Sequence, residues 1–142
     1  MSIPVIDIFA GPGGLGEGFS TITDEGGEKI FKTVLSIEMD KYAHQTLLLR
    51  SFYRQFQYSE VPSEYYDFLK QKISLNTLFE AFPKQAADAK EEAWCARLGD
   101  DNKSEPFDNV YYRIQKALKG CKDWVLPGRP DIVLISSVLQ YL

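Results

Sequence analysis

The sequence is poor in cysteine, and it lacks both a long apolar segment and a basic leader. Its two cysteines, Cys95 and Cys121, are too few and too far apart for a disulfide framework or a metal site. We expect both to be small, half-buried thiols, and we predict no metal. No apolar run approaches the ~20 residues that a membrane span needs, and no basic segment precedes a long apolar one. These absences predict a cytoplasmic protein with no membrane contact.

A basic excess is also missing, since the formal net charge is −4. A protein whose main surface faces DNA usually carries surplus lysine and arginine, because these side chains neutralise phosphates. The composition therefore gives no support to nucleic-acid binding by this chain alone. Its 142 residues and its apolar fraction of 44% instead predict one folded α/β domain with a real core.

The most informative stretch that is present is Val5–Phe19, which reads VIDIFAGPGGLGEGF. Its apolar start, interrupted by one acid, predicts a buried parallel strand, and a helix is expected over Leu15–Ile22. Four glycines, Gly11, Gly13, Gly14 and Gly16, follow the strand at once. Glycines let the backbone approach a ligand closely, and the first free amides of a helix point at it. The stretch predicts a nucleotide-binding corner, and the alternative is a tight turn between two core elements.

The spacing of these residues leaves the nucleotide open. Gly11, Gly13 and Gly16 satisfy G-x-G-x-x-G, and a second predicted strand over Ile30–Glu38 ends in an acid 22 residues after the last glycine. A carboxylate at about this spacing binds ribose hydroxyls. NAD and S-adenosylmethionine both contain an adenosine ribose, so an NAD-binding oxidoreductase domain is one interpretation.

The residue sequence of the two segments favours S-adenosylmethionine over NAD. Asp7–Gly14, which reads DIFAGPGG, is followed by Ile37–Ala43, which reads IEMDKYA. This pattern resembles the first two motifs of the cytosine-C5 DNA methyltransferases, and the likeness covers residues 5–49. It implies a Rossmann-like class I methyltransferase fold, here the N-terminal half of it, with a mostly parallel sheet and helices on both faces.

The same resemblance implies a site for S-adenosylmethionine. Phe9 would pack on the adenosine, and the backbone of Ala10–Gly14 would line the methionine moiety. Glu38 would accept hydrogen bonds from the ribose hydroxyls, and Met39 would cover one face of the adenine. Asp100, which follows a predicted third strand over Trp94–Gly99, would bind the adenine amino group. The implied cofactor-binding residues are Phe9, Ala10, Gly11, Pro12, Gly13, Gly14, Glu38, Met39 and Asp100.

The nucleophile of the family has no counterpart in this chain. Residues 130–140 read PDIVLISSVLQ, where the family reads P-D-V-V-x-G-G-P-P-C-Q with the cysteine just past the end of its fourth strand, so Leu139 stands at the cysteine position. A leucine cannot form the covalent bond to C6 of a flipped cytosine. The resemblance therefore implies a DNA (cytosine-5-)-methyltransferase fragment that holds the cofactor, has no catalytic residue and is inactive alone.

Nothing in the 142 residues resembles the family's glutamate segment or its DNA-recognition lobe. DNA is thus a partner only by resemblance, and a partner chain could supply the missing half. A non-catalytic S-adenosylmethionine-binding partner or sensor is the remaining alternative. A shortened chain, a frame change near Ser136 and a natural degenerate relative all fit the sequence.

The rest of the chain predicts helices around the strands. Lys41–Phe56 is helical by pattern, with Asp40 as its N-cap. No strand is expected from residue 57 to residue 93, where three short helices form an insertion or an elongated crossover. A further helix over Asn109–Lys119 and a fourth strand over Asp131–Ile135 complete the expected domain.

Overall fold

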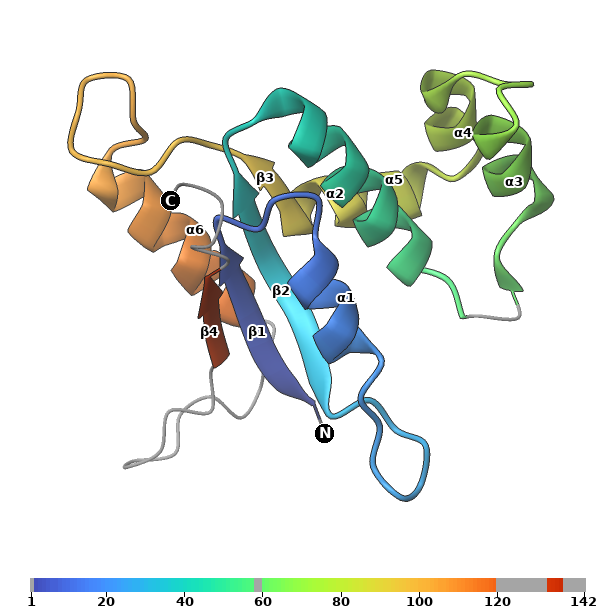
Figure 1. Cartoon of the computed structure of the whole chain (residues 1–142), viewed down its shortest axis with the longest axis horizontal. Coiled ribbons are helices and arrows are strands. Elements are labelled where there is room, and N and C mark those ends of the chain that lie inside the picture. The colour runs from blue at the N-terminus through green and yellow to red at the C-terminus, as the bar shows by residue number, and fades with distance from the viewer. Residues whose placement is uncertain (1, 58–59, 120–132, 137–142) are drawn as a thin grey trace.

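The chain forms an α/β structure built on one small parallel sheet (Figure 1). The computed structural model describes residues 2–57, 60–119 and 133–136. In chain order the elements are β1 (Ile3–Ile8), α1 (Gly14–Ser20), β2 (Phe31–Glu38), α2 (Lys41–Arg54), α3 (Ser63–Leu69), α4 (Leu75–Ala81), α5 (Pro83–Glu92), β3 (Ala93–Cys95), α6 (Phe107–Lys119) and β4 (Val133–Ser136).

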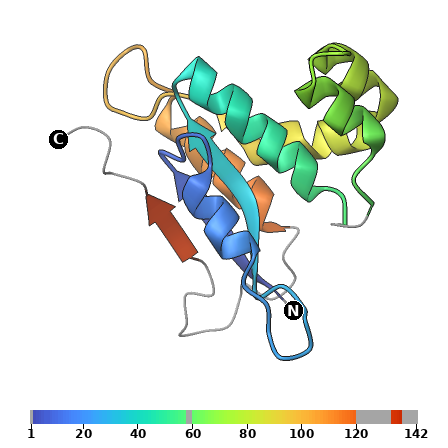
Figure 2. The ribbon, with the colours of Figure 1, turned by 45° about the vertical axis from the view of Figure 1, so that its right-hand side comes forward.

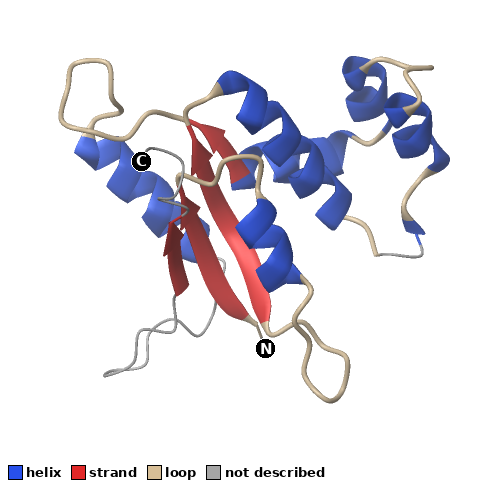
Figure 3. Ribbon diagram, in the orientation of Figure 1, coloured by secondary structure: helices blue, strands red, loops and turns tan. Residues whose placement is uncertain are grey.

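The strands lie in the order β3-β2-β1-β4, and every neighbouring pair is parallel (Figure 3). The chain runs from β1 outward through β2 to β3 and then crosses to the other side of β1 for β4. The point between β1 and β4 is therefore a topological switch point, where ligands of open α/β sheets bind at the carboxyl ends of the strands. This arrangement is compatible with a Rossmann-like fold.

Alternate residues of the central strands face opposite layers. Ile6, Leu35 and Ile37 form an apolar core with Leu118 of α6. Asp7 lies on the other face, under α1. Figure 2 shows α1 and α6 on opposite sides of the strands, so the expected helices on both faces are present.

Two helix starts follow directly from the sequence. Asp40 accepts hydrogen bonds at Oδ1 from the amides of Tyr42 and Ala43, which confirms it as the N-cap of α2. Pro83 occupies the first turn of α5, where its missing N–H costs nothing. α1 ends at Ser20, two residues earlier than expected, and the polar loop after it is closed by an isolated bridge between Thr23 and Lys29.

After α2, the described residues of the crossover from β2 to β3 form three short helices and no strand, as expected. α5 packs on α2 and leads directly into β3, whereas α3 and α4 extend away from the sheet (Figure 1). An aromatic cluster joins them, in which Phe52 lies 5.1 Å from Phe79 and Phe56 lies 5.5 Å from Phe82 between ring centroids. α5 therefore belongs to the crossover itself, and α3 with α4 is the elongated part.

The third strand is shorter than the predicted Trp94–Gly99. Cys95 pairs with Glu38, the last residue of β2, so no strand remains to pair beyond it. The amide of Ala96 still donates to the carbonyl of Glu38 at 3.0 Å. The length of β3 is thus set by its neighbour and not by its own residues.

In the described part of the chain, no helix has the length and apolar character that crossing a bilayer requires.

Candidate functional site

The loop after β1 is a tightly held turn at the carboxyl edge of the sheet. The backbone angle φ is positive at Phe9, Gly11 and Gly13, with values of 60°, 57° and 87°. Glycine adopts this conformation freely, whereas at Phe9 it stores roughly 1–3 kcal/mol of strain. The amide of Ala10 donates to the carbonyl of Ile37 at 2.9 Å. Backbone strain of this kind concentrates at ligand sites, so the loop is a candidate for one.

The space around the glycines of the loop differs from one glycine to the next. A Cβ on Gly13 would lie 2.8 Å from Cδ1 of Leu47, so a larger residue here would have to displace that side chain. A Cβ on Gly14, the first residue of α1, would meet no atom within 4 Å. Pro12, which precedes Gly13, is exposed. The outer surface of the turn is therefore open to a ligand.

Glu38 joins this turn to the end of β2. One carboxylate oxygen accepts from the amide of Gly11 at 2.7 Å, and the other accepts from the amide of Asp40 at 2.7 Å. The side chain is buried, and both bonds are short, as charge-assisted bonds are. A carboxylate offers about four lone-pair positions, so two backbone donors leave room for ribose hydroxyls.

Large apolar side chains flank this buried carboxylate. Phe9 and Met39 are 43% and 44% exposed although each directly follows a buried strand. Small-molecule sites combine apolar walls with a few well-placed polar groups. The structure therefore brings together, at one edge of the sheet, all the implied residues from the first two motifs: Phe9, Ala10, Gly11, Pro12, Gly13, Gly14, Glu38 and Met39.

Asp100 lies in the loop that leaves β3 where its last residue pairs with Glu38. It is exposed in the loop after β3, and no hydrogen bond or ion pair among the described residues connects it with Glu38. The ordered acid of this loop is its neighbour Asp101, whose carboxylate accepts from Ser104 Oγ at 2.8 Å and from Arg97 at 2.8 Å. These bonds, that from Ser104 above all, hold the pKa of Asp101 below its usual value.

The fourth strand ends where the resemblance expects its chemistry. Ser136 at the end of β4 pairs with Ile8 at the end of β1, so this strand reaches the same edge as the glycine turn. Residues 131 and 132 of the predicted strand over Asp131–Ile135 lie outside the described residues, and β4 covers Val133–Ser136. Leu139, at the family's cysteine position, lies outside the described residues, as does Cys121.

Asp7 lies in the first motif, but the motif does not predict the environment of its side chain. It is fully buried, and neither carboxylate oxygen has a hydrogen-bond partner among the described residues. The hydroxyls of Thr33 and Ser36 are buried and unpartnered in the same way. Burial raises the pKa of Asp7 to about 6, against an opposing contribution from Arg54. The one sequence signal is the acid that interrupts an otherwise apolar strand.

The expectation of a half-buried Cys95 is wrong. Its thiol is exposed because Cys95 is the last residue of β3, an outer strand of the sheet with β2 as its strand neighbour.

Neither the family models, nor the curated proteins, nor the solved structures with which the chain was compared give a match. The functional conclusion therefore depends on the chemistry of the site itself.

Replacing Glu38 with alanine should lower the free energy of unfolding of the ligand-free protein by about 1–3 kcal/mol, because the buried amide of Gly11 loses its acceptor. Urea denaturation measures this loss. Met39→Ala is the matched control at the neighbouring exposed position, with an expected change within about 0.5 kcal/mol. An equally small change for Glu38→Ala would show that the turn does not depend on the carboxylate.

Proposed function

We propose that the chain binds S-adenosylmethionine, or its product S-adenosylhomocysteine, at the carboxyl edge of the sheet. The observation that supports this most is the position of Glu38, a buried carboxylate at the end of β2 that is bonded to the glycine turn after β1. Its spare lone pairs suit the two ribose hydroxyls. The exposed side chains of Phe9 and Met39 offer apolar surface for the adenine.

The charge near the helix start favours a sulfonium ligand over NAD. The first turn of α1 carries Glu17, and no side chain caps its start. A diphosphate over this start would lie next to a helix turn whose one charged side chain is acidic, although Arg54 pairs with it. The methionine moiety of S-adenosylmethionine carries an ammonium group that a nearby carboxylate favours.

We infer further that the sheet is the N-terminal half of a class I methyltransferase-like domain. The strand order and the switch point between β1 and β4 support this. By its motifs the domain is of the DNA cytosine-C5 methyltransferase kind, and the proposed part of this chain is to hold the cofactor. Leu139 offers no nucleophile, so methyl transfer itself is not proposed for this chain.

Calorimetric titration with S-adenosylhomocysteine and with NAD tests the proposal. We expect saturable binding of S-adenosylhomocysteine and at least about tenfold weaker binding of NAD, which corresponds to about 1.4 kcal/mol. Met39→Ala should weaken binding of S-adenosylhomocysteine, whereas Leu69→Ala, at a similarly exposed position on α3, should not. Tighter binding of NAD would contradict the proposal and favour an oxidoreductase domain.

A further inference from the structure

Asp7 adds a second buried carboxylate next to the proposed cofactor site. It pairs with Ser36 across β1 and β2, and Glu38 lies two residues further along β2. Since side chains alternate along a strand, the side chains of Asp7 and Glu38 extend from the same face of the sheet. Asp7 also stands two residues before Phe9, where the turn after β1 begins. Two carboxylates therefore lie at the edge where the ligand is proposed to bind.

The carboxylate of Asp7 lies beneath the first half of α1. A Cβ added to Gly16 would lie 3.6 Å from Oδ2 of Asp7. Gly16 is the third residue of α1, whose first residue is Gly14. With a rise of about 1.5 Å per residue, the backbone of Ala10–Gly14 comes within roughly 10 Å of this carboxylate. The proposed function assigns the methionine moiety to that backbone, so the sulfur of the ligand is expected at a distance of this order.

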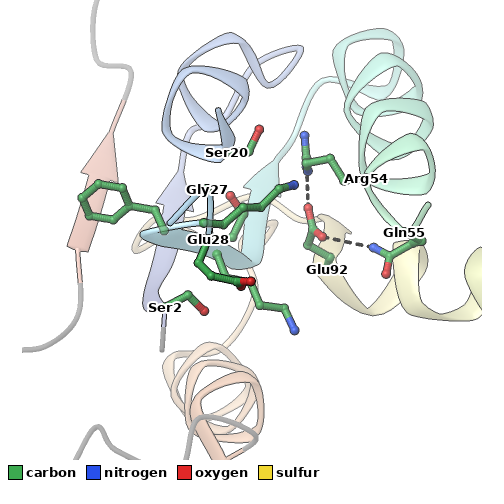
Figure 4. A pocket seen from close by; sticks show the side chains of 11 residues that line it. Ser2, Ser20, Gly27, Glu28, Arg54, Gln55 and Glu92 are labelled. Carbon is green, nitrogen blue, oxygen red and sulfur yellow. Dashed lines mark hydrogen bonds and ion pairs between the residues drawn. The ribbon is translucent and has the colours of Figure 1, made fainter. Parts of the chain in front are cut away.

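The surroundings of Asp7 balance its charge poorly. Neither carboxylate oxygen has a hydrogen-bond partner among the described residues. Burial raises the pKa of Asp7 to about 6, opposed by the positive charge of Arg54 of α2 and assisted by the negative charge of Glu38. The guanidinium of Arg54 also forms ion pairs with Glu17 of α1 and Glu92 of α5. Figure 4 shows the bond between Arg54 and Glu92, both of which line the pocket drawn there.

A buried carboxylate of this kind acts on a ligand through its electric field and needs no contact with it. Salt screens the field of a buried charge much less than that of an exposed one. Two opposite unit charges about 10 Å apart, at an effective dielectric constant of about 20, change a binding constant by roughly tenfold. The effect of Asp7 on a charged ligand at the glycine turn is therefore large enough to measure.

We propose that Asp7 is a specificity-determining residue, which favours the cationic sulfonium of S-adenosylmethionine over the neutral thioether of S-adenosylhomocysteine. The inference rests on the proposed function, because it needs the ligand at the glycine turn. The two ligands share the adenosine and the amino-acid part, and they differ in one methyl group and one positive charge. The ionised carboxylate attracts that charge, whereas the protonated acid does not, so the preference increases with pH. At neutral pH the chain thus holds the methyl donor more firmly than its product.

Calorimetric titration with each ligand at pH 5 and at pH 7.5, at constant ionic strength, tests this. The measured quantity is the dissociation constant of S-adenosylhomocysteine divided by that of S-adenosylmethionine. In the parent protein this ratio should increase by about threefold to tenfold between the two pH values. In Asp7→Asn the ratio should be lower at pH 7.5 and equal at both pH values. An unchanged ratio in the parent protein, or the same increase in Asp7→Asn, would overturn the inference.

His44→Gln is the control, because a histidine also changes its charge in this pH range. His44 lies in the first turn of α2 and is the one histidine of the chain. The variant should keep the increase in the ratio. Loss of the increase in His44→Gln would assign the effect to the imidazole and overturn the role of Asp7.

Two further readouts keep the inference separate from the proposed function. Saturable binding of both ligands with a ratio independent of pH would contradict the inference alone, whereas saturable binding of neither would contradict the proposed function as well. If Asp7→Asn does not fold, titrations of the parent protein at pH 6 in two buffers of different ionisation enthalpy count the protons released. S-adenosylmethionine should release more protons than S-adenosylhomocysteine, and equal numbers would overturn the inference.

Discussion

Arg54→Met should lower the free energy of unfolding by about 3–5 kcal/mol. Arg54, the last residue of α2, forms ion pairs with Glu17 of α1 and with Glu92 of α5. Its side chain is 9% exposed and that of Glu92 is 10% exposed. Removal of one partner of a buried pair leaves an uncompensated charge in a poorly hydrated place, which costs far more than the pair itself contributes. Urea denaturation measures the loss.

A triple variant separates the charge effect from lost packing. Arg54→Met combined with Glu17→Gln and Glu92→Gln removes all three charges of these ion pairs, so it should recover most of the lost stability. Arg50→Met, four residues earlier on the same helix and without an ion pair within the described residues, controls for removal of an arginine. A loss below about 1 kcal/mol for Arg54→Met would show that its pairs behave as surface pairs.

Asp7→Asn should stabilise the protein at neutral pH by about 2–3 kcal/mol. Burial raises the pKa of this carboxyl from 3.8 to about 6 in the folded protein, and a pKa difference of one between the folded and unfolded states corresponds to about 1.36 kcal/mol. Well below pH 3.8 the group is protonated in both states and costs nothing. As the pH rises to 6 the unfolded chain releases the proton first, so the folded state loses stability that it does not regain above pH 6.

The advantage of the Asp7→Asn variant should therefore appear between pH 4 and pH 6 and stay constant above that window. Unfolding free energies measured from pH 3.5 to pH 7.5 test this. Asp88→Asn, at an exposed position on α5, is the control for replacing an aspartate that is not buried. A constant difference between Asp7→Asn and the parent protein over the whole range would mean that Asp7 does not titrate with a raised pKa.

The parts of this fold that the sequence predicts well are those decided locally. The apolar runs before Gly11 and Met39 become β1 and β2, and Asp40 and Pro83 begin helices where their side-chain chemistry suits the first turn. The turn of the candidate site is found in the same way, because its glycines stand directly after a strand.

The parts that the sequence does not predict depend on distant residues. β3 stops at Cys95 because β2 stops at Glu38, and the exposure of that thiol has the same cause. The ion pairs of Arg54 join it to residues 37 and 38 positions away in the chain, and no local sequence pattern predicts them. The resemblance implies a role for Asp100, but the contacts in this loop depend on its conformation. The acid that forms hydrogen bonds within the loop is Asp101.

The composition of α1 has a consequence for local opening. Three of its seven residues are glycines, and Gly16 is its one buried residue. Each interior glycine costs about 1 kcal/mol relative to alanine in a helix, and little apolar area holds this helix to the sheet. Its amides should therefore exchange with solvent deuterium through a fluctuation that needs much less free energy than global unfolding. A ligand at the glycine turn must suppress that fluctuation, and part of its binding energy is used to order the helix.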